Sequence, residues 1–69
     1  MNKDILKGHW KEAKGKLKAK WGKLTDDSIS AMEGNYEELS GKIQKAYGYN
    51  KEQADREIKD FLEKNQWRD

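Results

Sequence analysis

A repeat of 26 residues constrains this chain more than any other feature of its sequence. The segment GHWKEAKGKLKAKWG at residues 8–22 aligns with GNYEELSGKIQKAYG at residues 34–48, and the glycines at the first, eighth and last positions coincide. The aromatic residues match in kind, Trp10 with Tyr36 and Trp21 with Tyr47. Because such self-similarity indicates one structural unit used twice, we interpret residues 1–69 as a single domain with copies at about 8–33 and 34–64.

Apolar side chains recur in both copies at the spacing of an α-helix. In the first copy they lie three or four residues apart, at Leu6, Trp10, Ala13, Leu17, Trp21 and Leu24. In the second copy the same stripe contains Tyr36, Leu39, Ile43 and Tyr47. This spacing places the apolar residues on one face of each helix.

Each long helix is followed by signals that end it and begin another. Gly22 and Gly48 stand where C-terminal caps are expected. Thr25 precedes a predicted short helix at 26–33, and Asn50 with Gln53 three residues later resembles a capping box that opens a helix at 51–64. The sequence therefore predicts an all-α fold of four short helices, paired as two α-hairpins.

Composition supports this fold class. The chain has no Val, no Pro and one Thr, so little favours strands and nothing forces a helix to break. The absence of Cys excludes disulfides and thiolate metal sites. We expect the core to contain Leu6, Trp10, Leu17, Trp21, Leu24, Ile29, Met32, Tyr36, Leu39, Ile43, Tyr47, Ile58, Phe61 and Leu62.

Three glycines lie within the predicted long helices, roughly opposite their apolar stripes. Gly8, Gly15 and Gly41 each cost about 0.8–1 kcal/mol relative to alanine if they are helical and exposed. One interpretation is that the helices break or fray near Gly15 or Gly41. The other is that another surface approaches the backbone closely there, and the sequence leaves both open.

The charges are divided along the chain. Residues 1–25 carry eight lysines against Asp4 and Glu12, a net charge of +6, whereas residues 26–69 carry five lysines and two arginines against eleven acids, a net charge of −4. Such a basic helix with aromatic residues is typical of sequence-independent, salt-sensitive phosphate binding. The candidate polyanion-binding residues are Lys7, Lys11, Lys14, Lys18 and Lys20.

Two alternatives compete with polyanion binding. The basic helix is also expected to pair with acids elsewhere in the fold, for which the candidates are Glu37, Glu38, Asp55 and Asp60. Association with a membrane surface is disfavoured, because it would remove the apolar face of this helix from the core.

No pattern in the sequence indicates catalysis. His9 is the one histidine, and with Glu12 one turn later it offers two metal ligands where a zinc site needs three or four. Asp26 and Asp27 follow Thr25, where acids favour a helix N-terminus. We therefore expect no enzyme, no cofactor and no metal. We further expect a cytoplasmic location, from the absence of a signal peptide or a long apolar segment, and a monomer.

The string GHWKEAKGKLKAKWGKLTDD at residues 8–27, with GKIQKAYGY at residues 41–49, resembles the CsbD-like family of small bacterial stress-response proteins. The likeness covers nearly the whole chain and is closest to the YjbJ-type members. It implies a SAM-domain-like bundle of two crossed α-hairpins and a role in the general stress response. It supplies no catalytic residues, so we expect a non-enzymatic protein that acts through macromolecular interaction. The expected partner is a protein or none, with weak nucleic-acid binding through the lysines as the alternative.

Overall fold

A computed structural model describes residues 4–67, within which all regular structure is helical. There are five helices in this range: α1 (Asp4–Gly8), α2 (Trp10–Lys20), α3 (Asp26–Met32), α4 (Tyr36–Tyr47) and α5 (Lys51–Lys64). The predicted all-α class is confirmed. The expectation of four helices was wrong by one.

The additional helix arises because the first predicted helix is divided at His9. The backbone of His9, with φ −109° and ψ 18°, departs from helical geometry. The hydrogen-bond ladder nevertheless continues, since His9 N–H donates to the Ile5 carbonyl at 3.2 Å and Ala13 N–H to the His9 carbonyl at 2.8 Å. Gly8 precedes the division, and glycine commonly marks a kink. The change of direction lets α1 pack against α4 while α2 follows its own axis.

Side-chain caps fix where three helices begin. The Thr25 hydroxyl accepts a hydrogen bond from Ser28 N–H at 3.0 Å at the start of α3. The Asn50 carboxamide oxygen accepts one from Gln53 N–H at 2.8 Å at the start of α5. Asn35 caps α4 in the same way. Each cap satisfies an N–H group that has no partner within the helix, so the predicted starts at Thr25 and Asn50 are confirmed.

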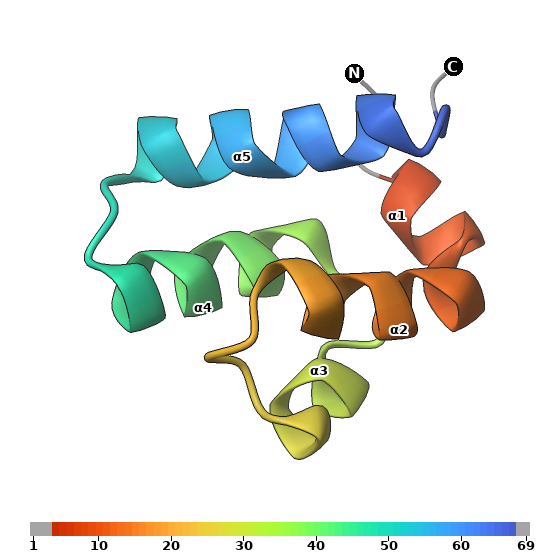
Figure 1. The fold of residues 1–69 in the computed structure, drawn as a ribbon, viewed down its shortest axis with the longest axis horizontal. Coiled ribbons are helices and arrows are strands. Elements are labelled where there is room, and N and C mark those ends of the chain that lie inside the picture. The colour runs from red at the N-terminus through yellow and green to blue at the C-terminus, as the bar shows by residue number, and fades with distance from the viewer. Residues whose placement is uncertain (1–3, 68–69) are drawn as a thin grey trace.

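The helices lie around one core (Figure 1). Helices α4 and α5 pack most extensively and run side by side as a hairpin closed by residues 48–50. Helix α2 contacts α3, and the short α1 lies near the C-terminal end of α5. The domain measures 29 × 25 × 18 Å along its principal axes.

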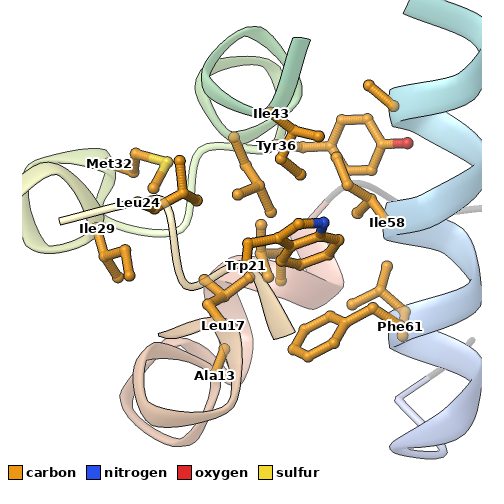
Figure 2. Close-up of a cluster of buried hydrophobic side chains, with 14 of the residues drawn as sticks. Ala13, Leu17, Trp21, Leu24, Ile29, Met32, Tyr36, Ile43, Ile58 and Phe61 are labelled. Carbon is orange, nitrogen blue, oxygen red and sulfur yellow. The ribbon is translucent and has the colours of Figure 1, made fainter. Parts of the chain in front are cut away.

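Trp21 stands at the centre of the core, between α2 and the Ile58–Phe61 face of α5 (Figure 2). Its indole meets the Phe61 ring at 5.2 Å between centroids and 55° between planes. Two expected core residues, Trp10 and Tyr47, are only partly buried. The buried apolar residues are Leu6, Ala13, Leu17, Trp21, Leu24, Ile29, Met32, Tyr36, Leu39, Ile43, Ala54, Ile58, Phe61, Leu62 and Trp67.

Gly34 brings the turn between α3 and α4 against α1. It is buried, its φ is +81°, and it follows Glu33 at φ 49°, so two successive left-handed residues reverse the chain. A Cβ atom at position 34 would lie 2.6 Å from the Lys7 Cα and 3.1 Å from the Lys7 Cβ. Only glycine combines this backbone conformation with this closeness.

The repeated glycines therefore have different structural roles in the two copies. Gly8, the counterpart of Gly34, has no atom near its missing Cβ. Gly48 adopts φ +71° and caps α4 as expected, whereas α2 ends earlier, at Trp21, whose N–H donates to the Leu17 carbonyl at 2.7 Å. The predicted C-terminal cap at Gly22 is thus wrong, because the helix is already closed one residue before it.

Both α2 and α4 continue without interruption through their central glycines. Gly15 and Gly41 are helical and exposed, and no atom beyond their own helical turns lies within 4 Å of a Cβ built on either. The interpretation that the helices break at these positions is therefore wrong. None of the helices within residues 4–67 is long and apolar enough to cross a membrane.

Candidate macromolecule-binding surface

The five candidate lysines are distributed over α1 and α2. Lys7 lies in the last turn of α1. Lys11, Lys14 and Lys18 lie on α2 at intervals of three and four residues, which places them along one side of that helix. Lys20 lies on a different side, where it reaches α5.

The ammonium groups of two of the five lysines contact other groups within the described residues. The Lys18 ammonium donates to the Gly22 carbonyl at 3.2 Å and to the Leu24 carbonyl at 2.8 Å, so it satisfies backbone oxygens just beyond the end of α2. The Lys20 ammonium lies 3.9 Å from a carboxylate oxygen of Glu57 and 5.4 Å from the Trp21 ring centroid. These contacts give Lys18 and Lys20 a structural role that their spacing in the sequence did not reveal.

We call the remaining three candidates the basic face: Lys7 at the end of α1, and Lys11 and Lys14 on α2. All three are exposed, and no acid within residues 4–67 forms an ion pair with them. Asp55 and Asp60 instead pair with lysines of their own helix, Lys51 at 2.8 Å and Lys64 at 3.3 Å. The expected neutralisation of the basic helix by acids therefore occurs, among these residues, only between Lys20 and Glu57.

A polar network that the sequence did not indicate joins α4 to α5. Ser40 is 2 % exposed, and its hydroxyl donates to an Asp55 carboxylate oxygen at 2.9 Å while it accepts from the Gln44 amide at 3.2 Å. The other Asp55 oxygen accepts from the Lys51 ammonium at 2.8 Å. A buried hydroxyl must find such partners, so Ser40 fixes how the two helices align. The sequence signal for this role was the position of Ser40 on the apolar stripe of the helix, one turn before Ile43.

Two groups beside this network have shifted pKa values. Burial raises the pKa of Tyr36 above its ordinary value of 10.0, and the Asp55 carboxylate raises it further. A hydrogen bond to Asp55, together with the attraction of its charge, raises the pKa of Lys51 above 10.5. Both groups contribute stability that is complete below their unfolded-state values and is lost as the pH rises through the folded-state values.

Replacing Tyr36 with phenylalanine is expected to make the domain less sensitive to alkali. In the parent protein the unfolded chain loses the Tyr36 proton more readily than the folded one, so raising the pH from about 9 to about 11 favours unfolding. Denaturant unfolding followed by tryptophan fluorescence at both values measures this loss. Lys51 is present in both proteins, and its pKa is raised mainly by Asp55, so most of its contribution to the pH dependence of stability is common to both. An equal loss of stability in the two proteins would show that the raised pKa of Tyr36 is not a source of the alkaline sensitivity.

His9 stacks on the ring of Trp67. The two ring centroids are 4.8 Å apart and the planes are nearly parallel, at 5°. Trp67 is 7 % exposed and also meets Phe61 edge-on at 5.8 Å, so it closes the core at the junction of α1 and α2. Within residues 4–67, no three His, Cys, Asp or Glu side chains are grouped to hold a metal ion.

The CsbD-like family model matches residues 4–56, which include all five candidate lysines and the Gly34 turn. The chain belongs to the CsbD-like family. This CsbD-like protein is 52 % identical over 68 residues to the UPF0337 protein YjbJ of Escherichia coli K12, with 99 % of each chain covered. It is 54 % identical over 65 residues to a UPF0337 protein of Bordetella pertussis, with 94 % of this chain and 98 % of that protein covered.

Proposed function

We propose that this CsbD-like protein is a non-enzymatic component of the general stress response. It acts in the cytoplasm as a monomer by binding other macromolecules, and the basic face of α1 and α2 is its contact surface. The observation that carries the proposal is the exposure of Lys7, Lys11 and Lys14, none of which forms an ion pair with an acid among residues 4–67. Family membership supports the stress context. The resemblance to the CsbD-like family also implies a SAM-domain-like arrangement of two crossed hairpins.

The partner that suits this surface carries repeated negative charge. Clustered lysines without arginine favour contact with phosphate or carboxylate groups as point charges, rather than bidentate reading of bases. A protein with an acidic surface is therefore one candidate partner. Nucleic acid, bound without sequence preference, is the second candidate. Both would contact the same three lysines. In each case added salt weakens the complex by screening.

Reversing two charges on the basic face tests the proposal. We expect Lys11→Glu with Lys14→Glu to weaken binding to duplex DNA and to inorganic polyphosphate at least about tenfold at low salt. The slope of log affinity against log salt should fall by about two. Lys18 is left in place because it also holds the carbonyls of Gly22 and Leu24. Fluorescence anisotropy with labelled probes measures both quantities.

A matched control separates the basic face from net charge. Lys42→Glu with Lys59→Glu changes the charge equally, on exposed residues of α4 and α5 that have no ion pair within residues 4–67. This control should retain most of the affinity and should restore stress survival to a deletion strain, whereas the basic-face variant should not. Equal effects of the two double variants would contradict the assignment of the contact surface.

A further inference from the structure

A second surface combines aromatic rings with a lysine at the junction of two loops. Tyr47 ends α4, and Tyr49 lies just before Asn50, the cap of α5. Gly48 between them adopts φ +71°, which turns the chain so that the two rings stack, with 5.6 Å between centroids and 22° between planes. We call Tyr47, Tyr49 and Lys23 the tyrosine stack.

Lys23 connects this stack to the loop between α2 and α3. Its backbone N–H donates to the Tyr47 hydroxyl oxygen at 3.3 Å, and its ammonium lies 4.9 Å from the centroid of the Tyr47 ring. Lys23 and Tyr49 therefore both contact Tyr47, and Tyr49 keeps part of its surface exposed. Both rings are half-buried against the core, and Lys23 is exposed.

Aromatic rings held next to a lysine have the chemistry that binds single-stranded nucleic acid. An unpaired base offers a flat face that stacks on tyrosine whatever its sequence, and the neighbouring phosphate attracts an ammonium group. A duplex offers no such face, because its bases are already stacked on each other.

We propose that the tyrosine stack binds single-stranded nucleic acid, with a base on Tyr49 and a phosphate on Lys23. This inference rests on the proposed function and makes its partner more specific. The basic face supplies long-range attraction to any polyanion, and the tyrosine stack adds a preference for unpaired strands. Unpaired strands should thus bind more tightly than a duplex or polyphosphate at equal salt.

The test compares three probes with two variants. The probes are a short oligo(dT), a duplex of equal length and inorganic polyphosphate, each titrated at low salt and followed by anisotropy. Tyr49→Ala is expected to weaken oligo(dT) binding about tenfold, the loss of one stacked base, while binding to the duplex and to polyphosphate stays unchanged. Tyr49→Phe keeps the ring and should keep the affinity for oligo(dT).

A measurement on the unaltered protein makes the test independent of folding in the alanine variant. The ring-proton resonances of Tyr49 should shift upfield when oligo(dT) is added and should stay in place when polyphosphate is added. Unchanged Tyr49 ring-proton resonances, with equal affinity for all three probes, would overturn the tyrosine stack as a binding site. The proposal that the basic face binds polyanions would then still stand. Absence of binding to every probe would overturn this inference and polyanion binding by the basic face together.

Discussion

Replacing Gly34 with alanine is expected to remove most of the free energy of unfolding of this domain. Two costs add at this position: a left-handed backbone for an L-residue, and a Cβ forced to within 2.6 Å of the Lys7 Cα. Together they amount to roughly 2–5 kcal/mol. A core of this size supplies about 3–5 kcal/mol in total. Circular dichroism at 222 nm with urea titration measures the loss.

Two other glycine variants separate these costs. Gly48→Ala meets a similar φ of +71° but no atom within 4 Å, so it should cost only about 1–2 kcal/mol. Gly41→Ala lies in an open helical position and should stabilise the domain by about 0.5–1 kcal/mol. If Gly34→Ala and Gly48→Ala proved equally stable, close packing against α1 would not be what requires glycine at position 34.

Replacing Trp67 with alanine should be similarly damaging. The indole is 7 % exposed and packs on His9 and Phe61. Its backbone N–H donates to the Leu62 carbonyl at 2.9 Å, so the chain after α5 is tied back onto the helix. Loss of a buried tryptophan costs about 3–5 kcal/mol. Thermal unfolding should show a much lower midpoint, or no cooperative transition.

The controls for Trp67 change one contact at a time. His9→Ala removes the stacked partner and leaves Trp67 covering Phe61, so it should cost only about 0.5–1.5 kcal/mol. Trp67→Phe keeps an aromatic ring in the same place and should recover much of the stability. A Trp67→Ala protein as stable as the His9→Ala protein would show that this residue is peripheral and does not close the core.

Local signals in the sequence were enough to place most helices. The helix predicted at 51–64 has the observed bounds of α5, because Asn50 supplies a side-chain cap and Ile58 lies on an unbroken apolar stripe. Thr25 marks the start of α3 for the same reason. Short-range hydrogen bonds and apolar spacing depend only on nearby residues, so they can be recognised without knowledge of the fold.

Features that depend on contacts between distant segments were not predictable in this way. The repeat equates Gly8 with Gly34, yet only Gly34 meets another helix, at Lys7. Lys18 matches Lys11 and Lys14 in spacing, but the chain bends back to place two carbonyl oxygens within its reach. Trp67 stands alone in the sequence, and its burial follows from its contacts with His9 and Phe61.

The most direct test of the proposed binding surface is a two-dimensional amide NMR titration of the protein with oligo(dT) at low and at near-physiological salt. We expect dispersed resonances, with shifts at residues 7–14 around the basic face and at residues 23 and 47–49 around the tyrosine stack. Both sets of shifts should diminish as salt is added. A spectrum that does not change at low salt, or shifts confined to α5, would contradict the central claim that the lysines of α1 and α2 form the binding surface.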